Sequence, residues 1–339
     1  MAEAQSRPYE FPVLVGDIGG TNARFAIVES REARPQPLAQ SRTTELPGPA
    51  EATGRALRSH HGPPPRSALI GVATQVDGPV ARLTNADWAI DAPALGAEFG
   101  VNRVTLLNDF VPVATALERL DERHSGALVR LGPEVEAKPG PRVVLGPGTG
   151  LGAAALIPAG ERLVVQSTEA GHIEFGPCER DEHAVFAELD RVCDRHTSEA
   201  VLSGPGLLRL YCAHAKSLSC APTCAEPRDV VAAHAEGDAV ATAALMHFAR
   251  LLGRFAGDMA LIFGATGGVY IAGGIAPRIA SVLVASEFRV AFERKAPLER
   301  FVRAVPTWLI KHPDPAIEGL AAIACDPKRF LFQSYTWTA

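Results

Sequence analysis

The sequence predicts an α/β protein of two domains, and three observations lead to this prediction. The chain has 339 residues, more than one ordinary domain needs, and 47% of them are hydrophobic while 21% are charged. Patterns of buried strands alternate with helical patterns, as expected where helices cover sheets. A strand followed by a glycine-rich loop occurs in both halves, in the stretches GDIGGTN and GPGTGLG.

The first half is predicted to begin with a hairpin, because only a few residues separate the apolar runs PVLVGDIGG and NARFAIVES. A later strand ends in two polar residues, which is where open α/β sheets place functional side chains. The remaining expected elements are a loop or edge strand at 31–49, a helix at 51–61, strands at 67–76 and 104–110, and a helix from 111.

The second half repeats the pattern of strand, glycine loop and polar residue. The stretch AAALIPAGERLVV contains Pro158 and a glycine turn between two apolar runs, so a hairpin is expected there. Helices are expected around 182–195, 204–215 and 238–263, and the strand GGVYIAGG is expected to lead into a helix near 277.

Charge and composition exclude several classes of protein. The formal net charge is −5 and no basic run stands out, so nucleic acid is not an expected partner. No signal-peptide pattern and no long apolar run is visible, which predicts a cytoplasmic protein without membrane contact. The six cysteines lack paired CxxC spacing and are expected to be reduced thiols rather than a metal cage.

The glycine loops predict phosphate binding, because closely approaching backbone N–H groups can hold an anion without a charged side chain. Neither loop carries the Gly-Lys-Ser/Thr ending of a Walker A motif. Residues 148–153 fit the dinucleotide pattern G-x-G-x-x-A, with Glu169 near the expected ribose-binding position. That pattern requires a helix directly after the glycines, whereas a hairpin is expected here, so we reject a nicotinamide site.

Six blocks in order, LVGDIGGTNARFAI, LLNDFVPVATAL, GPGTGLGAAAL, STEAGHIEFGP, EAVLSGPGLLRLY and GGVYIAGGIAPR, resemble the bacterial ATP-dependent glucokinase family. The resemblance runs from about residue 14 to 319. It implies the two-lobed actin/hexokinase-like (ribonuclease H-like) fold with a central cleft. The small lobe would comprise residues 1–117 plus 312–339, and the large lobe 118–311. Related ROK kinases carry a zinc-binding cysteine cluster after the GH histidine, whereas only Cys178 stands there, so the non-ROK branch is favoured.

The resemblance also implies a site for ATP and Mg²⁺. Asp17 would bind Mg²⁺ through water, which suits an ion that prefers oxygen ligands and keeps several waters. A glycine hairpin closed by an Asx turn is the structural alternative for this loop. The residues implied in ATP binding are Gly16, Asp17, Ile18, Gly19, Gly20, Thr21, Asn22, Gly148, Thr149, Gly150, Gly273 and Gly274.

For the sugar, the resemblance implies contacts from side chains that pair with hydroxyl groups: Asn85, Asn108, Glu169, His172 and Glu199. Asp109 is implied as the general base that accepts the proton of the attacking hydroxyl. The structural alternatives are a satisfied histidine at 172, a solvated or capping glutamate at 199, and a helix cap at Asp109.

The function that follows is the ATP-dependent phosphorylation of glucose on its 6-hydroxyl, by a chain expected to form a homodimer. Two alternatives stay open. One is a kinase for another hexose or an amino sugar, and the other is a sugar- or nucleotide-binding regulator that has kept the fold without turnover. Intact Asp17 and Asp109 favour the enzyme over the regulator.

Overall fold

The computed structural model describes residues 7–84, 86–120 and 126–339, and the chain divides into two compact units. Unit 1 comprises the chain up to residue 127 together with 154–167 and 312–339. Unit 2 comprises 128–153 and 168–311. The lobe boundaries expected from the sequence stay a prediction.

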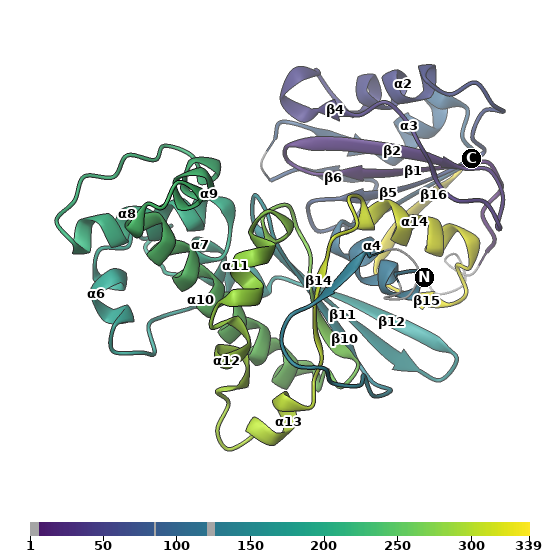
Figure 1. The fold of residues 1–339 in the computed structure, drawn as a ribbon. Coiled ribbons are helices and arrows are strands. Elements are labelled where there is room, and N and C mark those ends of the chain that lie inside the picture. Colours follow the sequence, from purple (N-terminus) through teal and green to yellow (C-terminus); the bar gives the residue numbers. More distant parts are fainter. Residues whose placement is uncertain (1–6, 85, 121–125) are drawn as a thin grey trace. The chain divides into compact units, whose positions relative to one another are not determined.

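Unit 1 is an α/β layer whose main sheet has the strand order β16-β8-β5-β1-β2-β3, with β4 also paired to β2 (Figure 1). Its elements are β1 (Val13–Ile18), β2 (Asn22–Val28), β3 (Gln36–Pro37), β4 (Ser41–Arg42), η1 (Thr43–Glu45), α2 (Pro49–Arg58), β5 (Ser67–Val72), β6 (Val80–Arg82), β7 (Ala89–Asp91), α3 (Ala92–Phe99), β8 (Arg103–Asn108), α4 (Phe110–Thr115), η2 (Ala116–Glu118), most of β11 (Leu151–Ala159) and β12 (Arg162–Thr168), α14 (Pro315–Cys325), β15 (Phe330–Leu331) and β16 (Ser334–Thr338).

The core of unit 1 lies around three parallel strands. β1, β5 and β8 run side by side, and β2 and β16 flank them antiparallel. Every residue of β5 is buried, as expected for a central strand covered on both faces. Helix α14 contacts both β1 and α4, and a side chain at Gly319 would overlap the backbone of Pro112. This close approach explains why α14 has glycine at that position.

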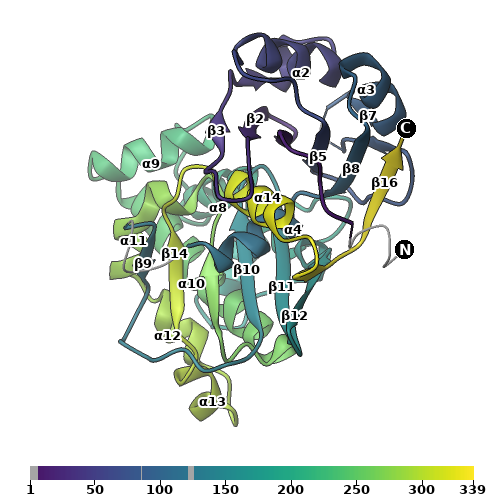
Figure 2. The same ribbon diagram turned by 90° about the vertical axis from the view of Figure 1, so that its right-hand side faces the viewer.

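Unit 2 combines a mixed sheet with a helical layer (Figure 2). Its strands β10, β13 and β14 are parallel, and β9 pairs antiparallel with β14. Its elements are β9 (Leu128–Arg130), β10 (Arg142–Pro147), η3 (Ala170–His172), α6 (Glu182–Ala187), α7 (Ser198–Val201), α8 (Gly204–Ser217), α9 (Pro227–Ala235), α10 (Ala239–Phe263), β13 (Gly268–Ile271), η4 (Ala276–Ile279), α11 (Ala280–Ala285), α12 (Phe288–Glu293), α13 (Glu299–Arg303) and β14 (Thr307–Ile310).

Helix α10 organises the core of unit 2. It begins at Asp238, whose carboxylate accepts from the backbone N–H of Ala241, and ends at Gly264 in the left-handed conformation. Its buried face includes Phe248 and Phe255, which are fully enclosed. The helix contacts β10 and β13 on one side and α12 on another. A 25-residue helix with so wide an apolar face is stabilised mainly by this packing.

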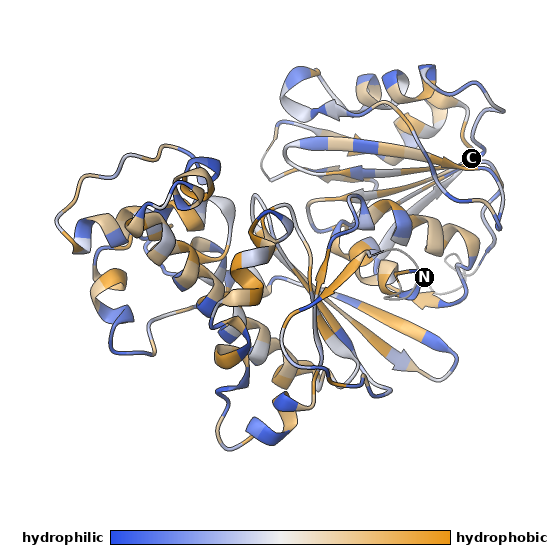
Figure 3. Ribbon diagram, viewed as in Figure 1, coloured by the Kyte–Doolittle hydropathy of each residue, from blue (hydrophilic) through white to orange (hydrophobic). Residues whose placement is uncertain are grey.

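Both predicted hairpins are confirmed. β1 and β2 pair antiparallel around the first glycine loop, and β11 and β12 follow one another around a turn with Gly160 at φ 63°. Figure 3 shows the hydrophobic character of β11 and β12 and the hydrophilic residues towards their turn. The hairpin after the second glycine loop is therefore consistent with rejecting a dinucleotide site.

The helix expected over 182–195 is much shorter than predicted. α6 ends at Ala187, and the chain then turns through Cys193 and Asp194, both with positive φ. Val192 and Arg195 exchange backbone hydrogen bonds across this turn. Two consecutive residues in the left-handed conformation cannot continue a helix. The residue types in this stretch did not indicate that conformation. No helix in the described part of the chain is long and apolar enough to cross a membrane.

Candidate active site

The residues predicted to act in unit 1 meet at one edge of its main sheet. In the parallel register, Ile18 lies beside Val72, which lies beside Asn108. The strands β1, β5 and β8 therefore end together, and with about 4.8 Å between neighbouring strands the ends of β1 and β8 lie about 10 Å apart. The first glycine loop and Asp109 leave the sheet at this edge, where open α/β sheets bind ligands.

The loop between β1 and β2 is a tight turn held by its own backbone. The N–H of Gly19 donates to the carbonyl of Asn22 at 2.9 Å. Thr43 fastens the turn from outside, because its hydroxyl donates to the carbonyl of Gly20 at 2.7 Å and its N–H to that of Thr21. The loop is thus a preformed turn with exposed Thr21 at its tip.

Two residues of the set predicted to bind ATP, Gly16 and Ile18, are packed within the sheet. Gly16 lies opposite Phe25 and beside Ile70, and a Cβ at this position would collide with both side chains. The side chain of Ile18 is fully buried in the core. Packing therefore explains the choice of residue at both positions, and only their backbone could face a nucleotide.

Asp17 lies in an ion-pair chain within unit 1. Its Oδ2 is 3.4 Å from a terminal nitrogen of Arg24, and the Nε of Arg24 is 3.3 Å from Oδ1 of Asp314. Burial raises the pKa of the Asp17 carboxyl, Arg24 partly offsets this increase, and the charge of Asp314 adds to it. The Asp17 side chain keeps 17% of its surface exposed, so part of its carboxylate remains accessible to a ligand.

Asn108 and Asp109, at the end of β8, differ in their hydrogen bonds to helix α4. The side-chain carbonyl of Asn108 accepts from the N–H of Phe110 at 3.0 Å, so Asn108 satisfies the first turn of α4. Its amide donates to Oδ1 of Asp109 and to the carbonyl of Thr74, each at 3.2 Å. Asp109 makes no side-chain capping hydrogen bond to α4. The capping role considered for Asp109 therefore falls to its neighbour, and the Asp109 carboxylate is oriented by an amide donor.

In unit 2, the second glycine loop is closed on itself and tied to α8. The N–H of Gly148 donates to the carbonyl of Gly150 at 2.8 Å, and the carbonyl of Gly148 accepts from the N–H of Gly204 at 2.8 Å. Ser203 caps α8 by accepting from the N–H of Gly206. The Gly148 amide is therefore used within the protein, although Gly148 belongs to the set predicted to bind ATP.

Glu199 joins this loop instead of capping a helix. Its Oε2 accepts from the N–H of Leu151 at 2.9 Å. The N-cap of α7 is Thr197, whose hydroxyl accepts from the N–H of Ala200, so the capping alternative for Glu199 is wrong. A Cβ at Gly150 would collide with the Glu199 carboxylate. The structure thus brings Glu199, which is predicted to bind the sugar, into direct contact with the loop that is predicted to bind phosphate.

Glu169 and His172 stand beside one another on η3. Their side chains are 57% and 58% exposed, and the His172 Nε2 is 3.8 Å from Oε2 of Glu169. A Cβ at Gly171 would overlap the carbonyl of Leu151, so η3 rests directly on the start of β11. The exposure of both side chains disfavours a histidine satisfied in the core.

The third glycine pair lies beyond β13 against the same loop. Gly273 has φ 82°, and a Cβ there would overlap the carbonyl of Pro147. The N–H of Ile275 donates to that carbonyl at 3.3 Å. Gly274 has open space around its Cα. Unit 2 therefore brings Gly273 against the second glycine loop, and the predicted sugar residue Asn85 lies outside the described residues.

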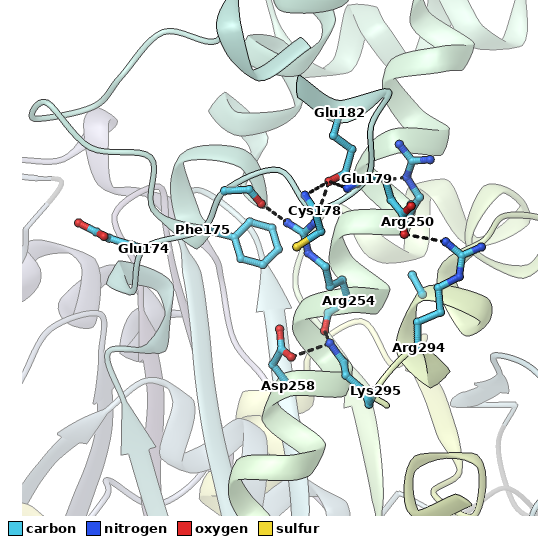
Figure 4. A pocket seen from close by; sticks show the side chains of 12 residues that line it. Glu174, Phe175, Cys178, Glu179, Glu182, Arg250, Arg254, Asp258, Arg294 and Lys295 are labelled. Atoms are coloured by element: carbon cyan, nitrogen blue, oxygen red, sulfur yellow. Dashed lines mark hydrogen bonds and ion pairs between the residues drawn. The ribbon is translucent and has the colours of Figure 1, made fainter. Parts of the chain in front are cut away.

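Sequence reasoning missed a charged cluster next to the segment that is predicted to bind the sugar, and Figure 4 shows this cluster around a cavity of about 350 Å³. Glu182, 1% exposed, accepts from the N–H of Cys178 at 2.7 Å and from Arg254 at 2.8 Å. Although burial favours the neutral acid, His247, the Cys178 amide and the Arg254 charge hold the pKa of Glu182 well below its usual range. Arg254 also donates to the carbonyl of Gly176.

This cluster holds the stretch that follows His172 through bonds to the backbone of Gly176 and Cys178. Lys295 lies at the far side of the cavity, where Nζ donates to Asp258 at 2.5 Å and to the carbonyl of Arg254 at 2.9 Å. The cationic heads that line the cavity already have acidic or carbonyl partners. Glu182 stands among many acids in the sequence CERDEH, and no motif or spacing distinguishes it.

The protein atoms fit a magnesium ion held mainly by its substrate. Within residues 7–84, 86–120 and 126–339, no group of three or more His, Cys, Asp or Glu side chains could cage an ion. Asp17 supplies oxygen atoms at the sheet edge beside the glycine turn, which matches an ion held by one carboxylate, phosphate oxygens and waters.

Two α/β units, each with a glycine turn where a strand ends and with carboxylates beside it, place the chain in the class of two-sheet kinases with an actin-like fold. The glucokinase family model matches residues 14–327, and the chain belongs to that family. It is 41% identical over 323 residues to a glucokinase of Brucella suis, which covers 95% of this chain and 93% of the relative.

Solved structures agree on the fold. A glucokinase from an Antarctic psychrotroph superposes with a TM-score of 0.80 at 30% identity, covering 93% of this chain and 99% of that one. A ROK family glucokinase from Streptomyces griseus, solved in complex with glucose and AMPPNP, gives a TM-score of 0.63 at 20% identity, covering 92% and 98%. The first comparison and the family match make this chain a hexose phosphotransferase of the glucokinase class.

Proposed function

We propose that the chain transfers the γ-phosphoryl group of ATP to the 6-hydroxyl of glucose, with Asp109 as general base. The observation that carries the proposal is the presence of two carboxylates at one sheet edge of unit 1, where Asp17 is the next-to-last residue of β1 and Asp109 directly follows β8. One carboxylate serves the nucleotide side and the other serves the acceptor. Family membership supplies the reaction class, and these residues supply the chemistry.

In the proposed step, the 6-oxygen attacks the γ-phosphorus while the bond from that phosphorus to the β,γ-bridging oxygen breaks. The proton of the hydroxyl passes to Asp109, and ADP leaves with its bridging oxygen. Support comes from the hydrogen bonds at Asn108, whose amide donates to the Asp109 carboxylate and whose carbonyl serves the helix. Asp109 is thereby kept in one orientation and is not consumed as a cap.

The phosphates of ATP are bound in this proposal by the two glycine loops and the backbone beside Gly273. A bound magnesium ion, held by Asp17 through water, would neutralise charge on the transferring phosphoryl group. Arg24 holds the Asp17 carboxylate in place from the other side. No lysine lies in either loop, so backbone N–H groups provide most of the protein's own stabilisation.

The sugar is bound by side chains that can pair with several hydroxyl groups. Glu169, His172 and Glu199 form this set in unit 2, and Asn108 in unit 1 adds its side-chain carbonyl, which can accept a second hydrogen bond. Asn85, from the same predicted set, stays a proposal from the family resemblance. A sugar that lacks one of the paired hydroxyls would leave a polar group without a partner, at a cost of about 1 to 3 kcal/mol.

A substrate panel tests the function directly. Release of ADP is followed by a coupled assay with ATP or polyphosphate as donor and glucose, mannose, fructose or glucosamine as acceptor. We expect turnover with ATP and glucose to exceed every other pair in kcat/KM. A higher value with another sugar would reassign the acceptor. Tight glucose binding without ADP release would instead support a regulator.

We further propose that the enzyme acts in the cytoplasm as a homodimer of two-lobed subunits, with the lobes divided near residues 117 and 312. Light scattering at concentrations spanning the assay range tests the dimer, and a single mass equal to the 35.8 kDa chain throughout would contradict it.

A further inference from the structure

Glu199 occupies a position between two predicted binding regions. Oε2 of its carboxylate accepts from the Leu151 N–H at 2.9 Å, directly after the second glycine loop. Among the described residues, Oε1 has no hydrogen-bond partner and can accept from a ligand. One oxygen thus serves the loop while the other is available to a sugar hydroxyl.

The backbone that carries Glu199 is held by buried neighbours and by hydrogen bonds. It lies on α7 between Ser198 and Ala200, which are 0% and 3% exposed. Thr197 caps the helix, and Arg209 donates to the carbonyl of Ala200 at 3.1 Å. Because the helix cannot shift easily, a displacement of the carboxylate must be taken up by its own torsions or by the loop.

The loop has little freedom to move independently of that carboxylate. A Cβ at Gly150 would collide with Oε2, and the carbonyl of Gly148 is held by the N–H of Gly204. On its other side, the carbonyl of Leu151 lies against Gly171, in the segment that carries Glu169 and His172. The second glycine loop and the residues predicted to bind the sugar in unit 2 therefore form one contiguous set of contacts.

We propose that Glu199 is a positioning residue that couples sugar binding to nucleotide binding, by orienting the second glycine loop through the Leu151 N–H. The inference rests on the proposed function. A hydroxyl bound at Oε1 fixes the carboxylate torsions, and the fixed Oε2 then holds the loop in the arrangement that receives phosphate. Hydrogen bonds to an ionised acceptor are stronger than neutral ones, which suits a carboxylate for this task.

Coupling is measured as the ratio of nucleotide dissociation constants without and with saturating glucose. A nonhydrolysable ATP analogue with Mg²⁺ is titrated by calorimetry into the full-length protein. For the unsubstituted chain we expect glucose to tighten the analogue at least about fivefold. In Glu199→Ala we expect this ratio to fall below about twofold, even at saturating glucose.

Two variants separate coupling from sugar affinity. Glu169→Ala removes another carboxylate of the sugar set, so it should need more glucose but keep the unsubstituted ratio at saturation. Glu199→Gln keeps an oxygen that can accept from Leu151 and should recover most of the ratio. Should Glu199→Ala not fold, Glu199→Asp replaces it, since a side chain shorter by one methylene loses the bond but keeps the charge.

Hydrogen exchange at the Leu151 amide supplies a readout without ligands or turnover. We expect its protection to fall about tenfold in Glu199→Ala and to stay near the unsubstituted level in Glu199→Gln and Glu169→Ala. An unchanged coupling ratio or unchanged protection in Glu199→Ala would overturn the inference. An unsubstituted chain that binds both ligands but fails to phosphorylate glucose would overturn the proposed function instead.

Discussion

Replacing Asp109 by asparagine separates its catalytic role from any structural one. Asparagine has nearly the same shape, but its amide cannot accept the proton of the attacking hydroxyl. We expect kcat to fall by about 10² to 10⁴ when glucose and ATP are saturating, the range that corresponds to loss of a general base. The assay is ADP release, measured at several enzyme concentrations so that a slow rate is resolved from background.

The structure predicts almost no loss of stability in the same variant. Asp109 makes no capping bond to α4, and an asparagine oxygen at 109 can still accept from the Asn108 amide. The free energy of unfolding, measured with urea, should therefore stay within about 0.5 kcal/mol of the unsubstituted chain.

Asn108→Ala is the comparison variant for stability and should lose much more of it than Asp109→Asn. It removes the acceptor for the Phe110 N–H and the donor to the Thr74 carbonyl, at 3.0 and 3.2 Å. Together these losses should cost about 1 to 3 kcal/mol of stability. The reasoning is refuted if Asp109→Asn keeps more than about a tenth of the unsubstituted kcat, or if it unfolds as easily as Asn108→Ala.

Three further predictions concern unit 2. Glu169→Ala should raise the KM for glucose about 5- to 100-fold without lowering the melting temperature, and steady-state kinetics with unchanged KM would count against a sugar contact. Gly273→Ala should weaken the binding of an ATP analogue and destabilise the fold by more than about 1 kcal/mol, because a side chain there would have a positive φ and would overlap a backbone carbonyl. Calorimetry measures the loss of binding and urea titration measures the loss of stability. A variant as stable as the unsubstituted chain would contradict this geometry. Burial and the charges of His247 and Arg250 lower the pKa of His214 from 6.5 to about 4. Between these pH values His214 is protonated in the unfolded chain but neutral in the folded chain. Stability should therefore fall as the pH drops from 6.5 towards 4, by about 1 to 2 kcal/mol after allowance for solvent screening, and His214→Gln should flatten that part of the profile.

Local patterns were sufficient to predict the parts of the fold that depend on neighbours in sequence. The hairpin around Gly19 follows from two apolar runs a few residues apart, and Asn108 at a strand end follows from the change from apolar to polar residues. The family resemblance added the positions of Glu169 and Glu199, which no periodicity indicates.

What could not be predicted depends on contacts between distant segments. The pairing of Arg24 with Asp314 joins the second strand to a segment near the end of the chain, and an arginine at that position alone indicates no partner. The pKa of the buried Glu182 is lowered because His247, Arg254 and backbone amides surround it in three dimensions. The end of α6 at Ala187 and the left-handed turn at Cys193 and Asp194 could not be predicted either, because no glycine or proline marks this stretch.

The return of the chain into unit 1 has a consequence for biosynthesis. β16 covers the outer side of β8, and Trp337 fills the space over Gly96, where a side chain would overlap its ring. Until a ribosome has released residues 334–338, the main-chain groups of β8 that face β16 have no strand to pair with, and the apolar surface under Trp337 is open. A nascent chain therefore carries an unfinished sheet edge throughout translation of unit 2, and chaperones that shield exposed strands should associate with it during that interval.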